Sequence, residues 1–129
     1  MPRHILLVHS DPLTRLIVES GLASYGYEVV STSTYRQAAE VLESRRVSVL
    51  VADLTDDTVG RLAFVKMART ADPSLAVIYT APTPAKVPDR DKVAGAPCLR
   101  APYHPHQLVS LIGHLFRRGA DEEGAPHAA

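Results

Sequence analysis

The sequence holds a single cysteine, no surplus of either charge and no long apolar run. Cys98 has no second thiol with which to form an internal disulfide or a cysteine-rich metal site. Lys and Arg number 14, as do Asp and Glu, so the positive surplus of non-specific nucleic-acid binders is missing. The apolar runs fall far short of the roughly 20 residues that span a bilayer. With no signal peptide before the first apolar run, we expect a soluble, cytoplasmic protein without membrane or nucleic-acid partners.

The sequence contains enough apolar residues to form one hydrophobic core. Its 129 residues, 46% of them hydrophobic, suffice for one domain and are too few for two domains of ordinary size. Short apolar runs that are typical of buried strands cover residues 4–8, 28–32, 47–52, 75–80 and 98–100. The run at 47–52 is the richest in β-branched residues, so we expect the central strand there.

The first helix is predicted from signals at both of its ends. Asp11 can cap it, Pro12 suits its first turn, and Gly26 can take the left-handed conformation that ends helices. Its apolar residues fall at helical spacing and make one stripe, formed by Leu13, Leu16, Ile17, Gly21 and Leu22.

Two more helices are predicted before a proline-rich region. Thr34 can cap the second helix, and the third spans about residues 61–71. Residues 81–97 contain four prolines, so any fourth helix there must be short or irregular.

A last helix is predicted from Pro105 onward, with Leu108, Leu111, Ile112 and Leu115 on its inner face. Beyond residue 118 the apolar period is lost. We therefore predict one domain over residues 1–118 and a disordered C-terminal tail over 119–129.

Strands that alternate with helices form a parallel sheet covered by helices on both faces. The sequence therefore predicts an α/β fold with a doubly wound, five-stranded parallel sheet. In such sheets ligands gather at the carboxyl ends of the strands. The residues at those ends are His9-Ser10-Asp11, Asp53, Thr80 and Ala101-Pro102.

This order of strand-end residues resembles the receiver domain of two-component response regulators, over about residues 3–117. The resemblance implies a flavodoxin-like (βα)5 fold with strand order 2-1-3-4-5. It also implies that Asp53 is the phosphate acceptor, and that Thr80 and Pro102 are the hydroxyl and the proline of the family's site.

The sequence departs from the family pattern at three positions. Where the family has an acid pair that holds Mg²⁺, this chain has His9 and Ser10, and Ala101 stands where the family has Lys. Asp11 follows one residue later and is better placed as a helix cap. Mg²⁺ prefers carboxylate and water oxygens, so we expect no cofactor, or weakly bound Mg²⁺ at most. Oriented charge supplies most of phosphoryl-transfer catalysis, so the phosphorylation site is predicted to be degenerate.

Two neighbours of Asp53 leave alternatives open. His9 is either a strand-end residue bonded to backbone or a protonated partner of Asp53 that mimics a bound metal. Cys98 matches the position of the family's switch aromatic and is either a small inert core residue or a reactive thiol.

We predict a non-enzymatic, stand-alone receiver-like signalling domain of a bacterial-type two-component or phosphorelay pathway, acting by protein–protein recognition. The resemblance implies a histidine kinase, a phosphotransfer protein or a downstream regulator as partner, with a homodimer as a further alternative. It places the partner face at residues 82–116, including Tyr103 and Leu108, and kinase docking on the first helix.

Two other functions remain open. A phosphorylatable single-domain regulator would pass phosphate from Asp53 in a relay. A small flavodoxin-like enzyme or nucleotide binder is disfavoured, because the first turn, residues 9–12, has none of the glycines that a phosphate-binding loop needs.

Overall fold

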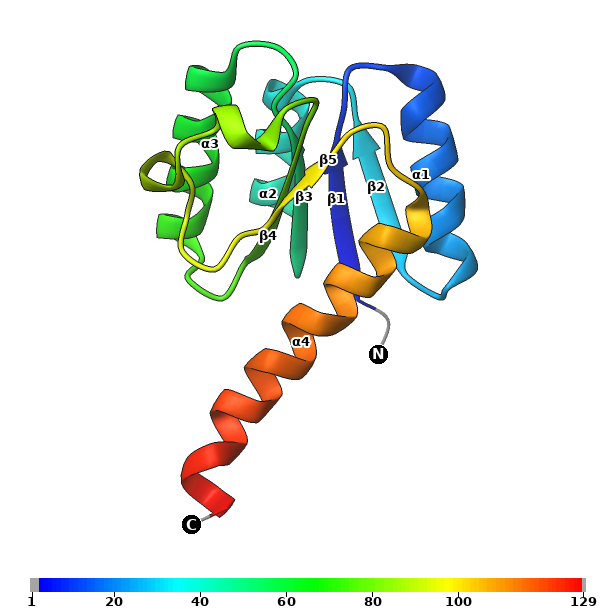
Figure 1. The fold of residues 1–129 in the computed structure, drawn as a ribbon. Coiled ribbons are helices and arrows are strands. Elements are labelled where there is room, and N and C mark those ends of the chain that lie inside the picture. Colours follow the sequence, from blue (N-terminus) through cyan, green and yellow to red (C-terminus); the bar gives the residue numbers. More distant parts are fainter. Residues whose placement is uncertain (1–2, 129) are drawn as a thin grey trace.

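The computed structural model describes residues 3–128, and residues 118–128 through their backbone alone. Strands and helices alternate along the chain as the sequence predicts. The elements are β1 (His4–Val8), α1 (Pro12–Ser24), β2 (Glu28–Thr32), α2 (Tyr35–Ser44), β3 (Val49–Asp53), α3 (Thr58–Ala71), β4 (Ala76–Ala81), the 3₁₀ turns η1 (Pro84–Lys86) and η2 (Asp89–Asp91), β5 (Cys98–Arg100) and α4 (Pro105–Ala128). The parallel sheet has the order β2-β1-β3-β4-β5, which confirms the flavodoxin-like topology (Figure 1).

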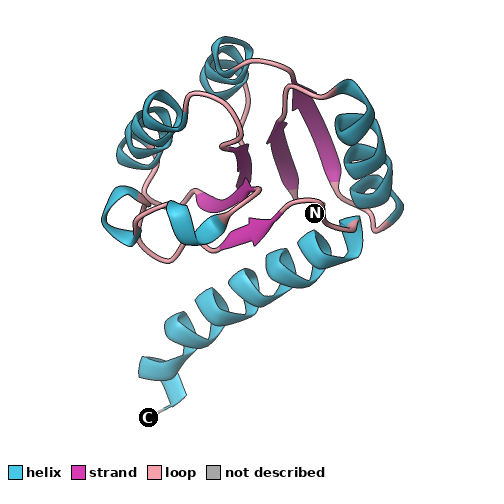
Figure 2. Ribbon diagram, turned by 45° about the horizontal axis from the view of Figure 1, so that its top comes forward, coloured by secondary structure: helices cyan, strands magenta, loops and turns pink. Residues whose placement is uncertain are grey.

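Helices cover both faces of the sheet (Figure 2). On one face, side chains of β1 and β3 such as Ile5 and Val51 pack against Val18 of α1 and Ile112 of α4. On the other face, the alternate strand residues pack against α2 and α3. All five residues of β3 are buried, so this strand is the centre of the core and ends in a buried Asp53.

The apolar stripe predicted on α1 is divided between an exposed part, on the helix expected to dock kinases, and a buried part. Leu13, Leu16 and Ile17 are 63%, 61% and 51% exposed, whereas Val18 and Leu22 face the core. Apolar residues occur nearly all round this helix, so the spacing alone fits either face. The sheet selects the face that contains Val18 and Leu22.

Two helix boundaries differ from those expected. α3 begins at Thr58, not near residue 61, because Asp57 (φ 39°) caps it by accepting a hydrogen bond from the Gly60 N–H. α4 continues to Ala128, where a disordered tail was expected from residue 119. A helix that has already formed is extended without a new nucleus, and residues 120–123 include good helix formers.

The proline-rich region forms the two 3₁₀ turns in place of a fourth crossover helix, as predicted for an irregular segment. Val87, between the turns, is buried and anchors the segment to the core. None of the described helices is long and apolar enough to cross a membrane.

Candidate functional site

Asp53 and Thr80 lie side by side at the carboxyl ends of β3 and β4, where the parallel register pairs them. The Thr80 hydroxyl donates a hydrogen bond of 2.9 Å to Asp53 Oδ1, and the Thr55 N–H donates to Oδ2 at 3.2 Å. Asp53 is 1% exposed and Thr80 is fully buried. Both carboxylate oxygens are therefore hydrogen-bonded inside the protein.

Two side chains with basic groups lie beside this carboxylate. Arg61 Nη1 is 3.7 Å from Asp53 Oδ2, and His9 Nε2 is 3.6 Å from Oδ1. Both distances are longer than a hydrogen bond, so the contacts are electrostatic. The two side chains are only 14% and 12% exposed, so solvent screens their electrostatic contacts with Asp53 weakly.

The guanidinium of Arg61 is held in place by the backbone of β3 and by an aromatic ring. Its Nη1 donates to the Asp53 carbonyl at 3.0 Å, and the Tyr35 hydroxyl donates to the same carbonyl at 2.8 Å. The guanidinium carbon lies 4.9 Å from the centre of the Tyr35 ring, and Phe64 meets that ring edge-on at 5.1 Å. Burial raises the pKa of Tyr35 above its usual range, so the hydroxyl stays a donor.

His9 is bonded to backbone through its other ring nitrogen. The Asp11 N–H donates to Nδ1 at 3.0 Å. A nitrogen that accepts carries no proton, so the ring proton is on Nε2 and faces Asp53. The arrangement is that of a neutral ring aimed at the carboxylate.

Neither Ser10 nor Asp11 forms a hydrogen bond or ion pair with Asp53 among the described residues. Ser10 is exposed, and the Asp11 carboxylate caps α1 by accepting from the Thr14 hydroxyl at 2.6 Å and the Thr14 N–H at 2.9 Å. The hydrogen bonds from Thr14, first from its hydroxyl, lower the pKa of Asp11. Arg15 closes the loop by donating to the His9 carbonyl at 2.9 Å.

The β5 side of the site is formed by small and aromatic residues. Cys98 is half-buried on β5 opposite Tyr79, and burial raises the pKa of its thiol. The Ala101 N–H donates to the Ala81 carbonyl, and the Ala101–Pro102 peptide bond is cis.

Tyr103 lies partly inside the molecule, although it was expected on the partner face. Burial, followed by the charge of Asp53, raises the pKa of its phenol to about 12. Its hydroxyl is buried near Thr80 but reaches no hydrogen-bond partner among the described residues. Leu108 is fully buried in the core, so the prediction that it contributes to the partner face is wrong.

No protein-family model matches the sequence, and no curated protein matches it either. Solved structures do match. The chemotaxis protein CheY4 of Vibrio cholerae is 19% identical, with a TM-score of 0.80 over 88% of this chain and 98% of that one. A response regulator receiver protein from Sinorhizobium medicae is 24% identical, with a TM-score of 0.79 over 90% and 95%. The chain has the receiver fold.

A third structure with this fold is the response regulator TrrA of Thermotoga maritima, in complex with Mg²⁺-BeF. It is 17% identical, with a TM-score of 0.77 over 88% of this chain and 98% of that one. At such identities the likeness establishes the receiver fold, and the site must be judged from this chain's own residues.

The residues of this receiver fold do not fit a magnesium ion. Among the side chains that the structure describes, no group of three His, Cys, Asp or Glu could hold a metal. Asp11, the nearest acid on the β1–α1 loop, is occupied as a helix cap, and Arg61 places a positive charge beside Asp53 Oδ2. A cation would meet one carboxylate and a competing guanidinium, where Mg²⁺ prefers several oxygen ligands.

Sequence reasoning missed Arg61 and Tyr35. Both donate hydrogen bonds to the backbone carbonyl of Asp53, and Arg61 also lies beside its carboxylate. One signal was present for Arg61. It lies in the first turn of α3, four residues after the Asp57 cap, where the helix dipole disfavours a cation. In the structure this arginine has its acidic partner outside the helix, in Asp53 at the end of β3.

Proposed function

We propose that this chain is a receiver-like signalling domain of a two-component or phosphorelay pathway, which works in the cytoplasm by binding other proteins and not by catalysis. Support for the receiver role comes from the fold and from the Asp53–Thr80 pair at the strand ends. The degenerate character rests on one observation. Asp53 is buried, and both of its oxygens accept hydrogen bonds from the chain itself.

A phosphodonor must bring an electrophilic phosphorus against a carboxylate oxygen of Asp53. At 1% exposure the carboxylate offers little access, and Ala101 supplies no ammonium to stabilise the incoming phosphoryl group. The conformation of the site therefore stays the same whether or not a phosphodonor is present.

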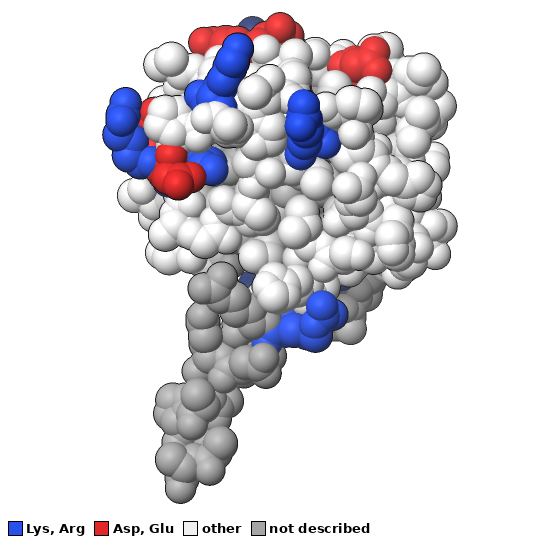
Figure 3. All heavy atoms as spheres, in the orientation of Figure 1, with Lys and Arg blue, Asp and Glu red and all other residues white. Residues whose placement is uncertain are grey.

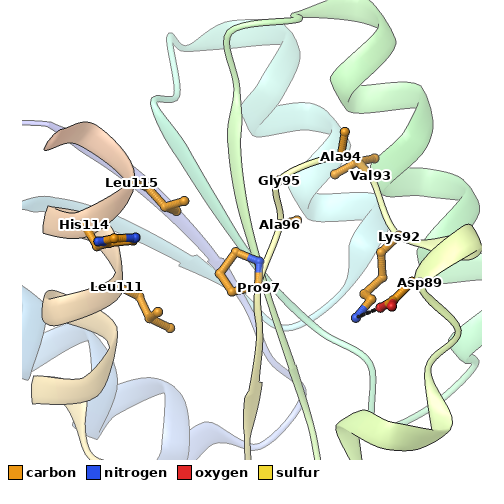
Figure 4. A pocket seen from close by; sticks show the side chains of 10 residues that line it. All are labelled: Asp89, Lys92, Val93, Ala94, Gly95, Ala96, Pro97, Leu111, His114 and Leu115. Carbon is orange, nitrogen blue, oxygen red and sulfur yellow. Dashed lines mark ion pairs between the residues drawn. The ribbon is translucent and has the colours of Figure 1, made fainter. Parts of the chain in front are cut away.

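Two surfaces are suited to a protein partner. One is the apolar stripe of Leu13, Leu16 and Ile17 on α1, and the face over α1 and β5 carries few charged side chains (Figure 3). The other is a groove of about 440 Å³ between the segment before β5 and α4 (Figure 4). Leu111 and Leu115 line its α4 side, opposite Val93 and Pro97.

A phosphorylatable relay protein is the second proposal, because the Asp53–Thr80 pair is complete. The two proposals differ in what acetyl phosphate and Mg²⁺ do to the wild-type chain. A protein-binding domain with a degenerate site should show no phosphoryl adduct by mass spectrometry, and its amide spectrum should not change. An adduct on Asp53 with shifts along β4 and β5 would favour the relay. Self-association, measured by sedimentation, is a separate alternative for the partner.

A further inference from the structure

Asp53 is 1% exposed, so its ionised form requires a positive charge within the protein. Burying an ionised carboxylate is costly unless it is paired and hydrogen-bonded. Thr80 and Thr55 supply the hydrogen bonds, but neither carries a charge. The charge must come from His9 or Arg61, the basic side chains within 4 Å.

His9 is the weaker source of this charge. Its Nδ1 already accepts from the Asp11 N–H, and a proton added at Nδ1 would place two donors against each other. Arg61, by contrast, keeps its charge at every ordinary pH.

The position of Arg61 is fixed by contacts that do not involve the carboxylate. Its Nη1 donates to the Asp53 carbonyl at 3.0 Å, and its guanidinium lies over the ring of Tyr35. Tyr35 is itself anchored to that carbonyl at 2.8 Å and packed edge-on against Phe64. A planar guanidinium suits this arrangement, because it can donate in its plane while stacking on an aromatic ring.

We propose that Arg61 is the permanent counter-ion of Asp53 and takes the place of a metal ion at this carboxylate. The chain thereby supplies from α3 a positive charge that His9, Ser10 and Ala101 do not provide, either directly or by holding a cation. Only the functional meaning of this ion pair, that it keeps a receiver-type site in a single state, rests on the proposed function. The ion pair itself is a property of the folded chain.

A double-mutant cycle tests the pair. Arg61→Gln should lower the Tm by about 10 °C or more, because it leaves a buried carboxylate without a counter-ion. In the Asp53→Asn background, where no charge needs compensation, the same substitution should lower the Tm by less than half as much. Arg61→Lys should fall between the wild type and Arg61→Gln when Asp53 is retained, because it keeps the charge and loses the planar stack.

Arg69 provides the matched control on the same helix. It donates to the carbonyls of Leu75 and Ala94 at 2.8 and 2.9 Å, with no acid in the contact. Arg69→Gln should therefore lower the Tm equally in the wild-type and Asp53→Asn backgrounds.

Equal losses for Arg61→Gln in both backgrounds would overturn the proposal and reduce Arg61 to a backbone-binding residue. If Arg61→Gln does not fold, the double variant with Asp53→Asn is examined by itself: its folding supports the ion pair, and its failure to fold has the same meaning as equal losses. No partner, phosphate or metal enters these measurements. A failure of the proposed signalling function therefore leaves this result unaffected, and the reverse is also true.

Discussion

Thr80 is the direct neighbour of Asp53 across the parallel register of β3 and β4, and its hydroxyl points at the Asp53 carboxylate at 2.9 Å. Just beyond the carboxylate, the Leu54 N–H donates to the Thr80 carbonyl at 2.8 Å. The two strand ends are thus tied together by backbone and side chain. This linkage holds the Thr80 hydroxyl at the carboxylate without any bound ligand.

Replacing Thr80 measures the strength of this linkage. Thr80→Val should lower the free energy of unfolding by about 2 kcal/mol, because a buried charged acceptor loses its donor. Thr32→Val is the control, since the Thr32 hydroxyl is buried with no partner among the described residues. That change should have little effect or should stabilise the fold slightly. Urea unfolding of both variants gives the comparison, and equal losses would contradict the role assigned to Thr80.

Restoring the family's missing residues should not be enough to restore phosphorylation. Ser10→Asp with Ala101→Lys supplies an acid and an ammonium, but Arg61 still lies 3.7 Å from Asp53 Oδ2. We expect weak labelling by acetyl phosphate in this double variant and stronger labelling once Arg61→Gln is added. Intact-mass measurement reports the adduct, with Asp53→Asn as the negative control. Strong labelling of the unmodified chain would instead favour the relay function.

Binding of Mg²⁺ to the wild-type chain should be very weak. The oxygens of Asp53 are engaged by Thr80 and Thr55, and among the described residues no group of three His, Cys, Asp or Glu side chains could hold the ion. A titration that follows the amide signals of His9, Ser10 and Asp53 should show no saturation at low millimolar Mg²⁺. Saturation in that range, lost in Asp53→Asn, would show that the site accepts the ion in spite of Arg61.

Tyr103 should make the fold sensitive to alkaline pH. Burial raises the pKa of its phenol from 10.0 to about 12, so the unfolded chain loses this proton first. The stabilisation by the buried neutral phenol is complete below pH 10. As the pH rises from 10 to 12 the free energy of unfolding falls by up to about 2–3 kcal/mol. Tyr103→Phe should lose less stability across this range and none at neutral pH, because it removes an unpaired hydroxyl. Urea unfolding at several pH values checks this, with the exposed Tyr25→Phe as control.

Local signals predicted the doubly wound α/β class, and the family resemblance added the strand order and the Asp53–Thr80 pair. Strand order followed from the alternation of periods together with the family resemblance, and the caps at Asp11 and Thr34 follow from residue type. Asp53 and Thr80 were expected at one edge because parallel strands bring their carboxyl ends together.

The side-chain positions that sequence reasoning missed depend on where the helices begin and how they pack against the sheet. The reach of Arg61 to Asp53 depends on where α3 begins, and that start was placed three residues late because the Asp57 cap was not recognised. Leu108 was assigned to the partner face although its inward spacing was visible, because the family surface was transferred as a range of residues.

The stripe on α1 gives the last prediction. Leu16→Ser should weaken binding of the protein partner by about 1–2 kcal/mol, because it removes apolar surface that the partner would bury. The fold should be unaffected, since Leu16 is 61% exposed. Val59→Ser, at an 82% exposed position on α3, is the matched control and should bind normally.

Asp53→Asn completes this comparison, and its binding should stay within about 1 kcal/mol of the wild type, as for an ordinary single substitution away from the interface. Proteins captured from a lysate of the source cells supply the ligand, and circular dichroism verifies that each variant is folded. If Asp53→Asn abolishes binding while Leu16→Ser binds normally, the carboxylate itself controls recognition, and the fixed-state account is wrong. If both variants bind normally, the partner surface lies elsewhere, and the groove beside Leu111 and Leu115 is the next surface to alter.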